Sequence, residues 1–273
     1  MHNLLFVLSQ ALVFPQQPNI YLEVVGDTHS TKDWVFFAPH ETEFVANQYV
    51  AKQVVDKGGM FIILRQDGKR LITLNVGGTK VKIDPNRMFT SHGRIESIKK
   101  LNPSIAEQKA LVNKTEQLAE TLSHFVLKAL NGNNKPTALV AMHNNTNGYE
   151  NDGNHGVGDV SIIRYQKKFS SGANYLIDVS HGSYDEDDLY FMTDREDFEA
   201  AKEQGWNVVL QNSEVAYDPS EDDGSLSVYA EMKGYRYINV EAERVNNGFG
   251  EDHLSVQTEM VDFVFSLLEE KNQ

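Results

Sequence analysis

Short apolar runs alternate with longer segments of helical periodicity along most of this 273-residue chain. The runs 20–25, 34–38 and 60–64 each have the length of a buried strand. Residues 41–57 carry apolar positions at helical spacing and end at Gly58-Gly59, a helix-stop signal. The other predicted elements are strands at 71–74, 137–142, 174–179, 206–210 and 237–240 and helices at 104–130, 194–204 and 252–270, with 137–142 and 174–179 as central strands. This alternation predicts one α/β domain, a twisted, mixed but mostly parallel sheet with helices on both faces.

Composition excludes several classes of protein. The formal net charge is −14, so a nucleic-acid partner is not expected, because phosphate binding needs a basic patch. No apolar run reaches the roughly 20 residues of a membrane span. Cysteine is absent, which excludes disulfides, thiolate metal sites and cysteine nucleophiles. Nothing in the composition sets the oligomeric state.

The first 14 residues have two interpretations. Residues 4–14 have the length of a signal-peptide core, and Ser9-Gln10-Ala11 is an acceptable cleavage site. The basic segment that normally precedes such a core is missing, and the alternative is a first element of the domain. We expect export to the periplasm or the medium rather than a cytoplasmic location.

Three candidate metal ligands follow two of the apolar runs. His40 and Glu43 come directly after the run 34–39, and His143 comes directly after the run 137–142. Parallel sheets bind ligands at the carboxyl ends of their strands, so these side chains are expected to converge. Two histidines and one carboxylate suit a catalytic zinc, which takes three protein ligands and keeps one position open for water. The set therefore indicates a metal-dependent hydrolase, with zinc favoured by its nitrogen and oxygen ligands.

Read in order, His40-x-x-Glu43, Asp84-Pro-Asn86-Arg87 and the isolated His143 form a pattern. This pattern resembles the zinc carboxypeptidase (funnelin) superfamily, which includes the succinylglutamate desuccinylase-like and aspartoacylase-like deacylases. The resemblance spans residues 34–265. It implies a zinc carboxypeptidase-like catalytic domain over residues 20–273 that holds one zinc ion through His40, Glu43 and His143.

The resemblance also implies how a substrate is held. Asn86 and Arg87 match the pair that grips the terminal carboxylate of the substrate, a role that suits the rigid two-pronged guanidinium group. Arg70 matches the arginine that polarises the scissile carbonyl group. Arg65 competes for that role, and the spacing to Arg87 favours Arg70.

The family places a glutamate base on a late strand. Here Glu241 and Glu243 both lie at that position, and period-two alternation puts them on one face of the strand. We favour Glu241 because it follows the apolar strand directly, with Glu243 as the alternative. A tyrosine that closes over the substrate is also implied, and the sequence does not choose among Tyr229, Tyr235 and Tyr237.

The chain departs from the family pattern in two places. Met88-Phe89 follows the Asn-Arg pair, and Asn144-Asn145 follows the third ligand. These departures indicate a divergent member that cleaves an amide bond next to a free carboxylate in a small peptide, a muropeptide or an N-acyl amino acid. A binding protein of the same fold without turnover is the alternative. The acidic clusters 185–188 and 221–223 lack the spacing of a calcium-binding loop and are expected to be solvated.

Overall fold

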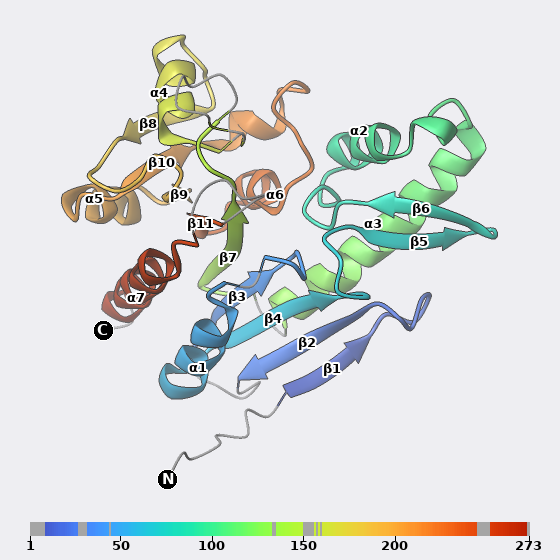
Figure 1. The fold of residues 1–273 in the computed structure, drawn as a ribbon, viewed down its shortest axis with the longest axis horizontal. Coiled ribbons are helices and arrows are strands. Elements are labelled where there is room, and N and C mark those ends of the chain that lie inside the picture. Colours follow the sequence, from blue (N-terminus) through green and yellow to red (C-terminus); the bar gives the residue numbers. More distant parts are fainter. Residues whose placement is uncertain are drawn as a thin grey trace.

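The structure is a computed structural model that describes residues 9–26, 32–43, 45–132, 135–149, 156, 158, 160–244 and 252–271. A sheet in strand order β1-β2-β4-β3-β7-β11-β9-β10-β8 runs through it (Figure 1). Its strands are β1 (Ser9–Val13), β2 (Tyr21–Gly26), β3 (Trp34–Ala38), β4 (Met60–Arg65), β7 (Ala138–Asn145), β8 (Leu176–Ser180), β9 (Leu189–Met192), β10 (Asn207–Gln211) and β11 (Tyr237–Glu243).

Strand direction changes across this sheet. The central strands β4, β3, β7 and β11 are parallel to one another, and β9 is parallel to β10. The pairs β1–β2, β2–β4, β11–β9 and β10–β8 are antiparallel. The sheet is therefore mixed, and the expectation of a mostly parallel sheet is not confirmed. Residues 137–142 form a central strand as predicted, whereas the segment predicted at 174–179 forms the edge strand β8.

Helices cover both faces of the sheet, as predicted. Side chains of β3 alternate between two apolar clusters: Val35 and Phe37 belong to one, and Trp34 and Phe36 to the other. The first cluster contains residues of α2 (Ser91–Leu101), α3 (Lys109–Asn131) and α6 (Leu226–Lys233), and the second contains residues of α1 (Asn47–Lys57), α5 (Arg195–Glu203) and α7 (Leu254–Glu270). Two-faced burial explains why β3 is apolar at every position.

The remaining elements lie at the two sides of the sheet. A hairpin of β5 (Ile72–Val76) and β6 (Thr79–Ile83) packs beside α2 and α3 (Figure 1). On the other side α4 (Ile162–Ser170) packs on β8. Short 3-10 turns occur at Pro103–Ile105 and Ser213–Ala216. Among the described helices, none combines the length and apolar character needed to cross a bilayer.

Two predicted helices differ from those in the structure. The helix predicted over 41–57 begins only at Asn47, and the segment before it forms turns in which the Glu43 amide donates to the His40 carbonyl. The helix predicted over 104–130 begins at Lys109, after a 3-10 turn. The preceding helix α2 was not predicted, although the side chain of Thr90 caps it by accepting from the Gly93 amide.

The start of the described chain belongs to the sheet. Ser9-Gln10-Ala11 lies in β1, which pairs with β2, and the side chain of Phe14 is fully buried. Residues 4–8 of the predicted apolar core lie outside the described residues. Export stays a prediction.

Candidate metal centre

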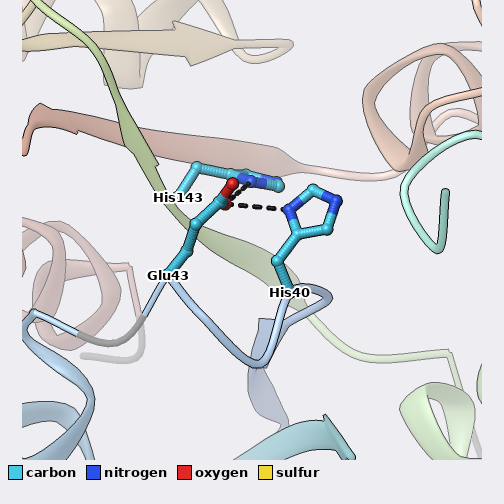
Figure 2. A group of neighbouring side chains, drawn as sticks. All are labelled: His40, Glu43 and His143. Atoms are coloured by element: carbon cyan, nitrogen blue, oxygen red, sulfur yellow. Dashed lines mark hydrogen bonds and ion pairs between the residues drawn. The ribbon is translucent and has the colours of Figure 1, made fainter. Parts of the chain in front are cut away.

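The side chains of His40, Glu43 and His143 meet in a buried group (Figure 2). Glu43 Oε2 lies 2.8 Å from His40 Nδ1 and 2.9 Å from His143 Nδ1. Two imidazole nitrogens and a carboxylate oxygen thus face one another, with all three side chains at most 7% exposed. These are the three ligands that the sequence predicted, and their atoms are close enough to share one metal ion.

Strand pairing accounts for this convergence. β3 and β7 are parallel neighbours in which Phe37 is level with Ala141, so His40 and His143 follow at the same edge of the sheet. The turn that carries Glu43 is held to β7 by the Asn144 side chain, whose Oδ1 accepts from the Val45 amide at 3.3 Å. The sheet therefore positions two ligands and a short turn positions the third.

Asp84 lies behind His40. Its Oδ1 is 2.8 Å from His40 Nε2, so Nδ1 of the same ring faces Glu43. A carboxylate behind a metal-binding histidine fixes the tautomer and orientation of the ring. Asp84 stood in the Asp-Pro-Asn-Arg segment, and no role was predicted for it. The neighbouring Asn86 contacts the other histidine, with its Nδ2 3.3 Å from His143 Nε2.

Burial favours the neutral form of both histidines in this group. Burial lowers the pKa of His143 to about 3, although the negative charge of Glu241 opposes this shift. Burial also lowers the pKa of His40 against the effect of Asp84. Burial alone would raise the pKa of Asp84, but the hydrogen bond and charge of His40, with Arg87 and Arg70, hold it well below its usual range. Metal ligands must be neutral imidazoles and ionised carboxylates.

Arg70 faces the same group. Its guanidinium forms an ion pair with Glu43, and its Nη1 lies 3.3 Å from His40 Nδ1. Arg65, the competitor for its role, points elsewhere and pairs with Glu23 at 2.8 Å. The structure thus brings Arg70, and not Arg65, to the predicted centre.

The centre opens into a cavity of about 530 Å³. Its lining is mainly polar and consists of His40, Thr42, Glu43, Arg70, Asn86, Arg87, His143, Asn144, Asn145, Thr146, Val160, Glu241 and Arg244. Arg244 was not singled out in the sequence; its guanidinium donates to the Thr42 carbonyl. Three arginines therefore line the cavity of an acidic protein.

Of the two candidate glutamate bases, Glu241 lines the cavity and Glu243 does not. Glu241 lines it from β11, where it is level with His143, and Asn239 Nδ2 donates to Glu241 Oε1 at 3.0 Å. Glu243 lies two residues further along the strand, outside the cavity lining, with its Oε2 3.3 Å from His253 Nε2. Geometry therefore favours Glu241, a distinction that strand periodicity alone does not make.

Arg87 faces this cavity and a smaller adjoining one of about 130 Å³. Its Nη1 donates to the Asn86 carbonyl at 2.8 Å, and its Nη2 lies 3.3 Å from Asp223 Oδ2. Gly224 packs against the same backbone with φ +81°, and a Cβ there would lie 2.7 Å from the Arg87 carbonyl oxygen. The loop at 222–225 therefore supports Arg87 closely.

The three candidate tyrosines occupy different places. Tyr237 lines the smaller cavity. Tyr229 and Tyr235 pack against each other with ring centroids 6.1 Å apart, and the Tyr235 hydroxyl donates to Asn131 Oδ1. Among the described residues, the lining of the larger cavity includes none of the three.

Replacing Asp84 by asparagine should weaken zinc binding about 10- to 100-fold, the usual effect of losing a carboxylate behind a ligating histidine. The affinity is measured by competition with a chromophoric chelator. Asp67→Asn, an exposed position on the turn after β4, is the matched control and should bind zinc like the wild type. Equal affinities in the wild type and Asp84→Asn would show that Asp84 does not orient a ligand.

No family model matches the sequence, and no curated protein matches it. Among solved structures, the chain is similar to the succinylglutamate desuccinylase from Chromobacterium violaceum, with 12% identity and a TM-score of 0.46 over 95% of this chain and 69% of that chain. It is also similar to a metallo-carboxypeptidase from Burkholderia cenocepacia, with 11% identity and a TM-score of 0.41 over 95% of this chain and 65% of that chain.

Proposed function

We propose that this protein is a zinc-dependent hydrolase that cleaves an amide bond next to a free carboxylate. The observation that carries the proposal is the approach of two imidazole Nδ1 atoms to one carboxylate oxygen of Glu43, 2.8 and 2.9 Å away, at the wall of a cavity. The substrate class is a small peptide, a muropeptide or an N-acyl amino acid.

The residues of the centre fit a zinc ion. His40, Glu43 and His143 are the two nitrogen ligands and one oxygen ligand of a catalytic site with an open position. Asp84 fixes the orientation of the first histidine, and the guanidinium of Arg70 already places a positive charge beside Glu43. Zinc bound by these residues would lower the pKa of a bound water toward ~7 and polarise the amide carbonyl.

Glu241 is the proposed general base. It shares the cavity with the three ligands, and its position level with His143 places its carboxylate beside the centre. In this role the carboxylate takes a proton from the attacking water and then delivers it to the leaving amine. Asn239 donates to Oε1, which holds the side chain in place.

The arginines of the cavity account for a carboxylate substrate in a protein of net charge −14. Arg70, Arg87 and Arg244 line the cavity together with Glu43 and Glu241, so arginines outnumber carboxylates there although the chain as a whole is acidic. Arg87 is the proposed partner of the substrate carboxylate, since a guanidinium binds a carboxylate through two parallel hydrogen bonds. Asn86 lies beside it, and Arg70 is the proposed residue that polarises the scissile carbonyl group.

Replacing Arg87 by alanine should raise KM for free-carboxylate substrates by about 10- to 100-fold, the equivalent of one charge-assisted contact. The same substitution should change KM for the matching C-terminal amides by less than about 3-fold. Both constants are measured with the zinc-reconstituted protein on N-acyl amino acids and on their amides. The newly formed free amino group is followed in both cases, on the amino acid released from the acid and on the amino acid amide released from the amide.

Arg65→Ala is the control, because this arginine lies outside the cavity lining and pairs with Glu23. It should leave both KM values unchanged. Equal increases for acids and amides in the Arg87 variant would overturn the carboxylate assignment. Hydrolysis that persists after chelation of all metal would overturn the proposed function itself.

A further inference from the structure

A second group of ionisable side chains lies at the end of β11. The acidic segment 185–188 was expected to be solvated, and Asp185 is exposed, but Asp187 and Asp188 are 0% and 1% exposed. The expectation was wrong for these two because they directly precede β9, which lies inside the sheet beside β11. The acidic composition of the segment did not reveal that β9 places these two residues in the interior.

The group is closely connected. Asp188 Oδ2 lies 2.7 Å from His253 Nδ1, and His253 Nε2 lies 3.3 Å from Glu243 Oε2. Ligand atoms of Asp187, Asp188 and His253 lie within 4.8 Å of one another, and the same holds for Asp185, Glu243 and His253. Four carboxylates therefore surround one imidazole.

One carboxylate oxygen of Asp187 has no hydrogen-bond partner among the described residues. Its Oδ2 accepts from the Gly148 amide at 2.5 Å, whereas its buried Oδ1 has no partner within the described part of the chain. Asn145, whose Nδ2 donates to the Asp187 carbonyl at 2.6 Å, has a buried Oδ1 in the same condition. Buried acceptors are almost always satisfied in native proteins, so these two oxygens call for a ligand.

We propose that Asp187, Asp188 and His253 form a second cation site, distinct from the centre at Glu43. Carboxylates are preferred by Mg²⁺, Ca²⁺ and Mn²⁺, whereas imidazole is preferred by the later first-row metals. A mixed set of two carboxylates and one imidazole therefore selects a divalent first-row ion such as Mn²⁺ or Zn²⁺. Asp185 and Glu243 form a separate group around the same imidazole, and Glu243 faces Nε2 of the ring, not the Nδ1 atom that faces Asp188.

The position of this site gives it a supporting role. Asp188 Oδ1 accepts from the Glu243 amide, two residues beyond Glu241, and His253 directly precedes α7. Asp187 accepts hydrogen bonds from the Gly148 amide and from the Asn145 side chain, and Asn145 lines the cavity of the first centre. A cation here would join β9, β11, the start of α7 and the cavity wall. We expect it to stabilise the fold rather than to take part in the chemistry.

Mn²⁺ is the probe, because bound and free Mn²⁺ are distinguished by electron paramagnetic resonance. In Glu43→Gln protein, in which the first centre is disabled, we expect one equivalent of Mn²⁺ to bind. At 100 times its Kd the ion should raise Tm by roughly 5 °C. Adding Asp187→Asn should remove both the binding and the shift in Tm. The amide keeps the shape of the carboxylate, so the double variant is expected to fold.

Two results would overturn the proposal. One is a Glu43→Gln protein that binds neither Mn²⁺ nor Zn²⁺. The other is a Glu43→Gln protein that still binds one equivalent of Mn²⁺ after Asp187→Asn is added. His253→Gln replaces Asp187→Asn if that variant does not fold, with the same expected loss. The test is independent of the proposed hydrolase, because a wild type whose bound ion is lost in Asp187→Asn but not in Glu43→Gln would support this site and reject the other.

Discussion

Replacing Glu241 by glutamine is expected to lower kcat by about 10²- to 10⁴-fold while the protein keeps its zinc. Glutamine preserves the shape of the side chain and its contact with Asn239, but it cannot take a proton from water. The three ligands lie on other side chains, so the metal centre should remain intact. The measurement pairs kcat on an N-acyl amino acid with zinc content by mass spectrometry.

Glu243→Gln is the matched control for this experiment. The same change two residues along β11 falls outside the cavity lining, so kcat should stay within a few-fold of the wild type. If Glu243→Gln abolishes hydrolysis and Glu241→Gln does not, the base has been assigned to the wrong residue. If neither changes kcat, neither glutamate acts as the base.

In an Asp187→Asn background, which removes the proposed second cation site, replacing Glu43 by glutamine is expected to remove zinc binding and hydrolysis together. The centre would lose its anionic ligand and keep two neutral imidazoles beside the positive charge of Arg70, an arrangement that repels a cation. We expect at least a 100-fold loss of zinc affinity, more than the loss of a residue that only orients a ligand. Equilibrium dialysis against zinc, followed by an activity assay on the dialysed protein, measures both.

Glu41→Gln provides the comparison. Glu41 lies two residues away, outside the cavity lining, and its Oε2 accepts from the amides of Gln66 and Gly68 at 2.8 Å each. Its replacement should leave zinc affinity unchanged. Wild-type zinc affinity in Glu43→Gln would remove Glu43 from the ligand set.

The parts of the fold that were predictable are those buried on both faces. The runs at 34–38, 60–64 and 137–142 are apolar at nearly every position, and each forms a strand of the parallel centre of the sheet. Strand direction was not predictable in the same way. At the edges, β1 pairs with the next strand along the chain, β2, whereas β8 pairs with β10 and not with the next strand, β9, and neither β1 nor β8 has a continuous apolar run.

The candidate site shows a similar division. His40, Glu43 and His143 were found because two apolar runs each end in a potential ligand, and parallel pairing brings those ends together. The contact of Asp84 with His40 joins residues 44 positions apart, and the sequence contained no spacing that would reveal it. The choice between Glu241 and Glu243 depends on where the cavity ends, and the period-two alternation of the sequence does not reveal this.

The central claim is that His40, Glu43 and His143 hold a metal ion, and its most direct test is zinc content. Wild-type protein and His143→Ala are supplied with zinc, freed of excess metal and analysed by mass spectrometry. An ion bound elsewhere adds equally to the zinc content of both proteins, so it does not affect the difference between them. We predict that the wild type holds one more zinc ion per chain than the variant. Equal zinc content in the two folded proteins would contradict the account.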